Sequence, residues 1–234
     1  MTPSAAGFDM SKGVGAYGGF SNTGSRNFIT QRDSLPPYST VLSASNSNDV
    51  VVLAGADNWD ISPVKNLALN SLQIEGYGSI GLKIFNAKNF KIANCDVQKF
   101  NKAGDISGTG ELDKVSFHHN TLSNESQNSK IVEILAYLPT FSGKPEDKGV
   151  TCTNCNFSDN LFGTNGGWIV YFFDGQLTFV NPTFLDYGTG TYQLGSNSPY
   201  PSAVLTFRGC TVRGGRDAIG HGGTLNYDSS NHEP

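Results

Sequence analysis

The chain has little charge, and it lacks the features that would link it to nucleic acid or a membrane. Charged residues make up 15% of its 234 residues, and the formal net charge is −4. Nucleic-acid binding needs a basic surface, which this composition does not supply. There is no run of about 18 apolar residues, and the start, MTPSAAGFDMSKG, lacks the basic and apolar blocks of a signal peptide. We therefore expect no nucleic-acid partner, no membrane insertion and no signal peptide.

What the chain does contain is an internal repeat. Six segments share a pattern of alternating apolar residues, two or three polar or small residues, and a further apolar residue. They begin at Asn66, Asn89, Lys114, Gly149, Gln176 and Val204. Their first apolar residues are separated by 23, 25, 35, 27 and 28 positions. Repeats of about 20 to 50 residues indicate stacked units that bury a shared apolar face.

Alignment of the six copies gives five columns. The first two are apolar: Leu67, Phe90, Val115, Val150, Leu177 and Leu205, then Leu69, Ile92, Phe117, Cys152, Phe179 and Phe207. The third is mostly polar: Ser71, Asn94, His119, Asn154, Asn181 and Gly209. The last two are Leu72, Cys95, Asn120, Cys155, Pro182 and Cys210, then Ile74, Val97, Leu122, Phe157, Phe184 and Val212. This pattern predicts short strands divided by a sharp corner.

The large apolar members of these columns should be buried in parallel stacks. We predict burial of Phe90, Ile92, Val97, Val115, Phe117, Leu122, Phe157, Leu177, Phe179, Phe184, Leu205, Phe207 and Val212. A second apolar run lies between the copies: SIGLKIF, AGDISG, KIVEILAY, GGWIVYFF, TYQLG and DAIGHG. One repeat therefore holds about three strands, as in one coil of a parallel β-helix whose equivalent strands lie about 4.8 Å apart.

The recurring signature φ-x-φ-x-N-x-x-φ-x-N resembles that of the single-stranded right-handed parallel β-helix superfold. Pectate lyases, polygalacturonase-type glycosidases and bacteriophage tailspike proteins share this fold. The resemblance covers roughly Asn66 to Gly223, and it implies an all-β solenoid of about six to seven coils. It also implies a corner ladder of stacked asparagines: Asn94, Asn154 and Asn181.

Three regions follow from the repeat. We place the β-helix over residues 48–225. Residues 1–47 form a Gly/Ser-rich N-terminal lead or a capping segment, and residues 226–234 form a polar C-terminal tail.

The four cysteines fit a core role better than a metal site or a disulfide. Cys152 and Cys155 form one CxxC, but zinc needs a second ligand pair, and the nearest histidines, His118 and His119, belong to the previous repeat. Cys95 and Cys155 share a column but lie two repeats apart, which is too far for a disulfide. We expect reduced, buried cysteines, no metal and no cofactor.

The second strand run gives the best candidate site. Alternation about the inward residues points a row of polar side chains outward: Lys83, Asp105 or Ser107, Glu133 and Gln193. The fourth repeat adds an outward aromatic residue, Trp168 or Tyr171. We predict Glu133 and Asp105 as catalytic residues, and Trp168, Tyr171, Gln193 and Lys83 as substrate-binding residues. The alternative is a merely polar outer face. In the resembling families, the corresponding sheet usually carries the substrate groove.

If the chain is an enzyme, Asp105 and Glu133 are the expected pair. Adjacent coils would place them about 5 Å apart, near the spacing of about 5 to 5.5 Å in retaining glycosidases. Two such close acids cannot both ionise freely, so one should have a raised pKa. We assign this role to Glu133, because its apolar neighbours desolvate it more than the glycine-rich GDISG desolvates Asp105. Glu133→Gln should then abolish cleavage.

Three functions are consistent with these observations. The first is a phage tailspike-like protein that binds a bacterial surface polysaccharide and, as a polysaccharide depolymerase, hydrolyses it. The second is a non-catalytic structural or adhesive module of a virion, favoured because no catalytic motif is complete. The third is a calcium-dependent polysaccharide lyase, which is the weakest because the arginines of the repeat region, Arg208, Arg213 and Arg216, all lie in its last part.

The open end of the stack bears on partners and location. No apolar cap follows the last repeat, so the final strand edges would be bare. We expect a homotrimer, or docking onto another virion protein. The expected location is the virion surface, or the extracellular space after assembly in the cytoplasm.

Overall fold

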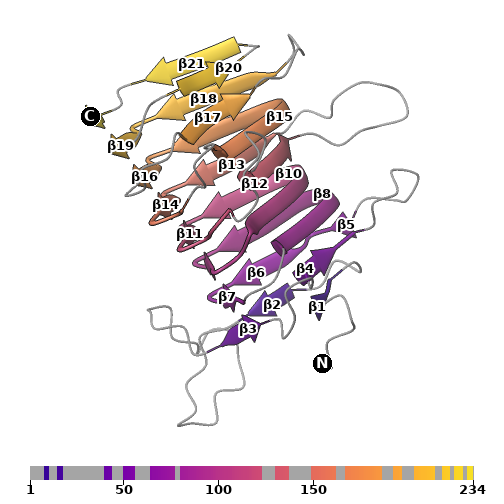
Figure 1. Ribbon diagram of the computed structural model, residues 1–234. Helices are drawn as coiled ribbons and strands as arrows, with labels where there is room; N and C mark the ends of the chain where they lie inside the picture. Colours follow the sequence, from indigo (N-terminus) through magenta and orange to yellow (C-terminus); the bar gives the residue numbers. More distant parts are fainter. Residues whose placement is uncertain are drawn as a thin grey trace.

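The computed structural model describes a series of ranges with gaps between them. They are residues 8–10, 15–17, 40–43, 50–55, 64–76, 80–122, 130–136, 149–161, 167–185, 192–196, 203–213, 218–221, 224–228 and 231–233. These ranges contain strands and no helix, so no helix in them could cross a membrane. Within each sheet, the strands follow one another in sequence order from the N-terminal to the C-terminal end of the stack (Figure 1).

The larger sheet has 14 strands, and three of them are long. Its main path is β1 (Phe8–Asp9), β4 (Val50–Ala54), β8 (Ile80–Ala93), β10 (Lys102–Asp113), β12 (Lys130–Ala136), β15 (Gly167–Val180), β17 (Tyr192–Ser196) and β20 (Ala218–His221). Beside it lie β2 (Gly15–Tyr17), β5 (Val64–Lys65), β6 (Ala68–Asn70), β13 (Val150–Thr153), β18 (Val204–Arg208) and β21 (Thr224–Asp228). The long strands β8, β10 and β15 each pair with two or three successive shorter strands along an edge. For example, β10 pairs with β12 and then with β13.

The second sheet has eight strands, all of them short. Its order is β22 (Asn231–Glu233), β19 (Thr211–Arg213), β16 (Thr183–Leu185), β14 (Asn156–Ser158), β11 (Ser116–His118), β9 (Asp96–Gln98), β7 (Gln73–Glu75) and β3 (Val41–Ser43). In both sheets the paired strands run parallel, and each strand joins its equivalent in the next repeat. The molecule is therefore an all-β protein with parallel sheets, an arrangement consistent with a parallel β-helix.

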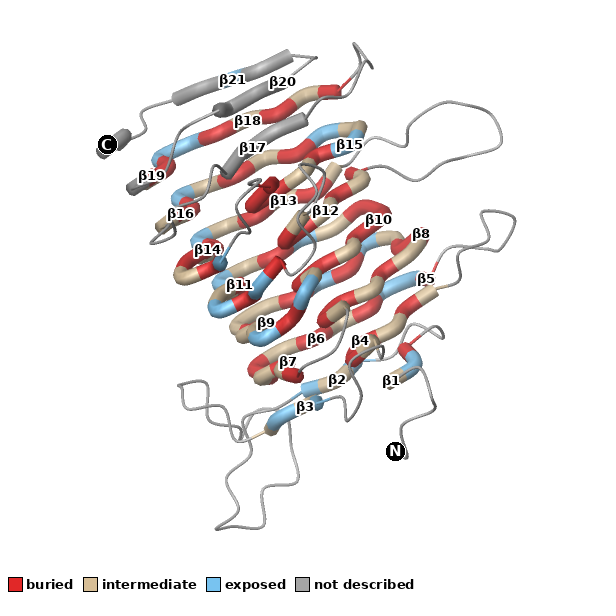
Figure 2. Tube along the Cα trace, viewed as in Figure 1, coloured by how far each residue is buried: buried red, intermediate tan, exposed pale blue. Residues whose placement is uncertain are grey.

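The core lies between the sheets, and the prediction of its residues is confirmed. All thirteen large apolar residues named from the columns are buried, and buried and less buried residues alternate along most strands (Figure 2). Phe157 stacks between Phe117 and Phe184, with ring centroids 5.3 and 4.9 Å away and interplanar angles of 13°. These spacings approach the separation of about 4.8 Å between neighbouring strands. Equivalent side chains of successive repeats therefore pack directly on one another.

The alignment of the third copy was wrong by five residues. Gly110, not Val115, pairs with Phe90 and Val150 in the first column. Val115 consequently belongs to the fourth column and Phe117 to the fifth, where it pairs with Val97 and Phe157. A Cβ at Gly110 would come within 2.4 Å of the Phe90 carbonyl oxygen. The close approach of two strands thus requires glycine at a position where the repeat otherwise has an apolar residue.

The predicted corner is present, but its asparagine ladder is only partial. Ser71, Asn94, Lys114, Asn154 and Asn181 have φ between 49° and 56°, the left-handed conformation that asparagine tolerates well. Lys114 takes the place assigned to His119. Asn181 Nδ2 donates to Asn154 Oδ1 at 3.4 Å, whereas Asn94 Nδ2 donates to Asn70 Oδ1 at 3.2 Å. The Asn154–Asn181 contact is confirmed, and Lys114 separates Asn94 from it.

A second, buried ladder was not predicted. Asn120 and Asn160 are buried at the end of the eight-stranded sheet's strands. Asn120 Oδ1 accepts from the Phe100 amide at 3.0 Å, and Asn160 Oδ1 accepts from Asn120 Nδ2 at 3.1 Å. Asn160 Nδ2 in turn donates to the Phe117 carbonyl at 3.0 Å. These side chains satisfy main-chain groups that the corner leaves without strand partners.

The cysteines are confirmed as core residues. All four are free and buried, and burial raises the pKa of Cys95 and of Cys210 to about 12. Val115, rather than Asn120, lies between Cys95 and Cys155 in the stack.

Both ends of the chain contribute strands where the sequence showed no repeat. Within residues 1–47, β1, β2 and β3 pair with β4, β6 and β7. Within the region around the predicted tail, β21 pairs with β18 and β22 with β19. The division of the chain into three regions stays a prediction.

Candidate functional site

The predicted outward row is present on the larger sheet. Lys83 pairs in register with Asp105, Asp105 with Glu133, and Glu133 with Tyr171. Asp105 is half-buried whereas Ser107 is buried, so Asp105 is the outward member of the predicted choice. The neighbouring inward residues Leu82, Gly104, Val132 and Val170 are all buried. The prediction that Asp105 and Glu133 occupy adjacent equivalent positions is therefore confirmed.

Two lysines that were not predicted contact the acids, and one of them, Lys102, connects the two. Lys102 Nζ donates to Asp105 Oδ2 and to Glu133 Oε2, each at 2.8 Å. Lys130 Nζ donates to Glu133 Oε1 at 2.7 Å and lies 4.0 Å from the centre of the Tyr171 ring. The four charged side chains are between 22% and 24% exposed. We call Lys102, Asp105, Lys130 and Glu133 the ionic cluster.

The lysines decide the protonation of the cluster. Burial by itself would raise the pKa of Glu133, but hydrogen bonds and charges from Lys102 and Lys130 outweigh burial and lower it. Burial favours the neutral amine of Lys102, but Asp105 and Glu133 outweigh that effect and raise its pKa. The pKa of Tyr171 is raised by burial and by the charge of Glu133. The predicted raised pKa of Glu133 is thus wrong, because Lys102 stands between the two acids and compensates both charges.

The predicted binding residues fall on two neighbouring columns. Tyr171 is half-buried in the Glu133 column, and its ring lies 6.4 Å from that of the exposed Phe173. Trp168 is only 2% exposed, with its ring edge against Tyr171, so it is not available as a stacking platform for a sugar. Gln193 pairs with Trp168, and its side chain lies outside the described part of the structure. Lys83 Nζ lies 5.1 Å from the centre of the Phe85 ring.

The sequence did carry a signal for the lysines. In KAGD and KIVE, a lysine precedes the acid by three residues, and the two side chains of each pair form an ion pair on the outer face. The fragments IGLK of β8 and WIVY of β15 align with them in register, so that their first and fourth residues occupy the positions of the lysine and the acid. Comparing whole fragments between repeats, instead of single columns, would have revealed the ionic cluster.

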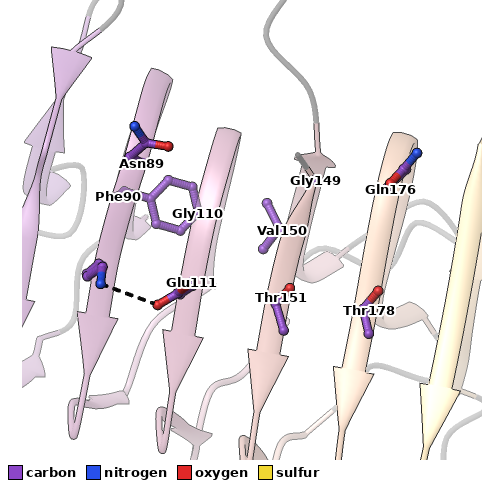
Figure 3. Close-up of a pocket in the computed structure, with 10 residues that line it drawn as sticks. Asn89, Phe90, Gly110, Glu111, Gly149, Val150, Thr151, Gln176 and Thr178 are labelled. Carbon is purple, nitrogen blue, oxygen red and sulfur yellow. Dashed lines mark ion pairs between the residues drawn. The ribbon is translucent and has the colours of Figure 1, made fainter. Parts of the chain in front are cut away.

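A polar groove lies on the second half of the same long strands. Its volume is about 490 Å³, and it is lined by Asn89, Phe90, Lys91, Gly110, Glu111, Gly149, Val150, Thr151, Gln176 and Thr178. Figure 3 shows it crossing β8, β10, β13 and β15, with Thr151 beside Thr178 and an ion pair between Lys91 and Glu111. The sequence prediction did not include this groove, although its outward residues are the middle positions of the apolar-x-apolar motif.

The cluster and the groove lie on either side of a bend. Between the two halves of β8, β10 and β15, Asn86, Gly108 and Gly175 have φ of 48°, 137° and 96°. A Cβ at Gly108 would come within 2.0 Å of the Ala87 carbonyl oxygen, so glycine is required there. The long strand β10 therefore carries the cluster residues Lys102 and Asp105 on its first half and groove residues on its second. On the first halves of β8 and β15, Lys83 and Tyr171 occupy the positions in register with Asp105 and Glu133.

Comparison of the chain with family models, with curated proteins and with solved structures gives no match. Within the described ranges, no group of three or more His, Cys, Asp or Glu side chains could hold a metal ion. The site has to be interpreted from its own geometry.

Proposed function

We propose that this chain is a right-handed parallel β-helix of about six to seven coils, similar to phage tailspikes, that binds a bacterial surface polysaccharide. The observation that carries the proposal is the polar groove across four neighbouring strands. The ionic cluster and Tyr171 lie on the same sheet, on the other side of the bend. The strand order supports the fold, because each sheet joins equivalent segments of successive repeats in parallel.

The groove offers the chemistry that a sugar chain needs. Thr151 and Thr178 present hydroxyl groups in register, Gln176 an amide, and Glu111 a carboxylate. Such groups can donate to and accept from sugar hydroxyls. Beyond the bend, Tyr171 and Phe173 supply aromatic surface for the apolar face of a sugar ring. Strands fix the spacing of all these groups, so little conformational entropy is lost on binding.

Binding without cleavage is the better-supported form of this proposal. A glycosidase needs one protonated carboxyl to donate to the leaving oxygen. The lowered pKa of Glu133 keeps it ionised near neutral pH, and Lys102 contacts both carboxylates. Hydrolysis by Asp105 and Glu133 remains the second candidate, because the two residues lie in adjacent register. It would require a ligand that displaces Lys102 from the pair.

The test is binding of the purified chain to a panel of bacterial capsular and lipopolysaccharide glycans. Thr151→Tyr places a bulky side chain in the groove, whereas Thr183→Tyr makes the same change on the eight-stranded sheet. We expect at least a tenfold loss of affinity in the first variant and wild-type affinity in the second. If Thr151→Tyr bound as tightly as Thr183→Tyr, the groove would be excluded as the binding site. If the parent bound no glycan in the panel, the structural or adhesive module would be favoured.

Hydrolysis is tested in the same panel by release of reducing sugar. We expect none from the wild-type chain. Release that Glu133→Gln abolishes, with binding retained, would instead establish the polysaccharide depolymerase.

We further propose that the stack is covered at its ends by other chains, as a homotrimer or by docking onto another virion protein, on a virion surface or outside the cell after cytoplasmic assembly. Support comes from the N-terminal end, where β3 is the last strand of its sheet among the described residues and both Val41 and Tyr17 are exposed. Bare edges with apolar side chains favour association. Sedimentation at micromolar concentration should show a trimer, and a monodisperse monomer would contradict it.

A further inference from the structure

The outer face of the eight-stranded sheet carries a pair of histidines that the proposed function does not use. His118 ends β11 and is half-buried, and the next residue, His119, is exposed. Their Nδ1 atoms lie 2.5 Å apart, with ring centroids 4.8 Å apart and planes 78° from parallel. His118 Nε2 contacts Asp96 Oδ1 on the neighbouring strand β9.

The backbone explains why two successive side chains reach the same place. In a regular strand they would point to opposite faces of the sheet. His118 keeps its strand position, paired with Gln98 and Ser158, but His119 has φ of 52°. This left-handed residue ends the alternation, so that the two rings meet on one side of the corner. This left-handed conformation is a regular feature of the repeat, because Lys99 and Asp159, at equivalent corners, have φ of 67° and 52°.

Asp96 determines which nitrogen of His118 is available. When the carboxylate accepts from Nε2–H, neutral His118 has its lone pair on Nδ1, facing His119. A carboxylate on the far nitrogen is the usual support of a metal-bound histidine, since it fixes the tautomer and the ring orientation. The nearby cation Lys99 is engaged by Glu75 at 3.2 Å.

We propose that His118 and His119 chelate one divalent transition-metal ion through their Nδ1 atoms, with Asp96 as a positioning residue and water in the remaining positions. Zn²⁺, Co²⁺, Ni²⁺ and Cu²⁺ bind imidazole, whereas Ca²⁺ and Mg²⁺ prefer oxygen ligands. With metal–nitrogen bonds of about 2.0 to 2.1 Å, a tetrahedral ion holds its nitrogens about 3.4 Å apart. The exposed His119 ring must rotate slightly outward from its present position to accept the ion.

The experiment uses the full chain without an affinity tag, stripped with chelator and titrated with ZnCl₂ in a calorimeter. We expect one ion per chain, and no competition from MgCl₂. His119→Asn keeps a residue that tolerates the left-handed corner but removes the imidazole, and it should lower the affinity at least tenfold, as should His118→Gln. His221→Asn is the matched control and should bind like the parent.

Asp96→Asn separates positioning from ligation. It should weaken Zn²⁺ binding on the order of tenfold, the usual effect of losing such a partner, while still binding one ion. With CuCl₂, electron paramagnetic resonance should show coupling to two nitrogens in the parent and fewer in His119→Asn. Circular dichroism checks that each variant is folded. The absence of Zn²⁺ binding by the parent at millimolar concentration, or binding as tight as the parent's by folded His118→Gln and His119→Asn, would overturn the site.

Discussion

The inward and outward sides of the same strands differ in how equivalent residues of successive repeats interact. Inside, Phe117, Phe157 and Phe184 stack in register, like on like. Outside, Asp105 and Glu133 are also in register, but Lys102 contacts both acids and Lys130 contacts Glu133. Parallel pairing repeats every chemical group at the strand spacing, which favours apolar rings and disfavours equal charges. A repeating strand can therefore reuse its inward residues, whereas outward residues need compensation from a neighbouring column.

The largest expected effect comes from breaking an inward stack. Phe117→Ala removes a fully buried ring between Val97 and Phe157 and should lower the free energy of unfolding by about 3 to 5 kcal/mol. The same change on the outer face, Phe173→Ala, removes an exposed ring and should cost far less. Denaturant unfolding of both variants measures the difference. Similar losses at the two positions would contradict the core described above.

The buried ladder tests whether an inward polar residue can be essential. Asn120→Ala removes the hydrogen bonds that the Asn120 side chain makes with the Phe100 amide and the Val97 carbonyl, and it should cost roughly 1 to 3 kcal/mol. Asn156→Ala is the control, because Asn156 is only half-buried and its side chain donates to the hydroxyls of Ser116 and Ser158, at 3.2 and 3.0 Å, instead of bonding main-chain groups. Its loss should be smaller in the same unfolding experiment. If Asn120→Ala were as stable as the parent, water would have replaced the hydrogen bonds of the ladder.

The ionic cluster should be worth more than an exposed ion pair. Lys102→Met removes the group that bonds both acids and should cost about 1 to 2 kcal/mol near neutral pH. Lys91→Met makes the same change in the groove, where Lys91 and Glu111 are 70% and 63% exposed and 3.8 Å apart. It should change stability by less than about 0.5 kcal/mol. Thermal unfolding at low salt compares the two, and equal values would show that the cluster is solvated.

Sequence reasoning predicted the inward side far better than the outward side. Alternation and repeat length were enough to identify thirteen buried residues, even though Gly110 concealed the true register of the third copy. Burial leaves a pattern of hydrophobicity along the chain. Compensation between charges leaves a weaker pattern: the spacing of three residues in KAGD and KIVE is visible in the sequence, but the contact between Lys102 and Glu133 joins residues 31 apart.

The same limit explains the other omissions. The groove is lined by threonines and glycines, among other residues, and the sequence does not mark them as binding residues. They form a groove only because the strands that carry them are neighbours. The sequence analysis placed His119 at the corner that Lys114 occupies, and nothing in the letters HHN distinguishes that corner from the one that follows β11.

The smallest expected effect is a change in the pH dependence of stability. The folded-state pKa of Glu133 is lower than its ordinary value of 4.5, so its ion pairs stabilise the fold above that pH, and this contribution is lost as pH falls through the folded-state pKa. Glu133→Gln should therefore be less stable than the parent at pH 7, and the difference should shrink as the solution is acidified below pH 4.5. Unfolding by urea across this range measures it. In a Lys102→Met background the same substitution should remove less, because one of the two lysines that lower this pKa is already gone. A difference that stayed constant down to acid pH would show that the lysines do not set the charge of Glu133, and the hydrolytic role of this residue would regain support.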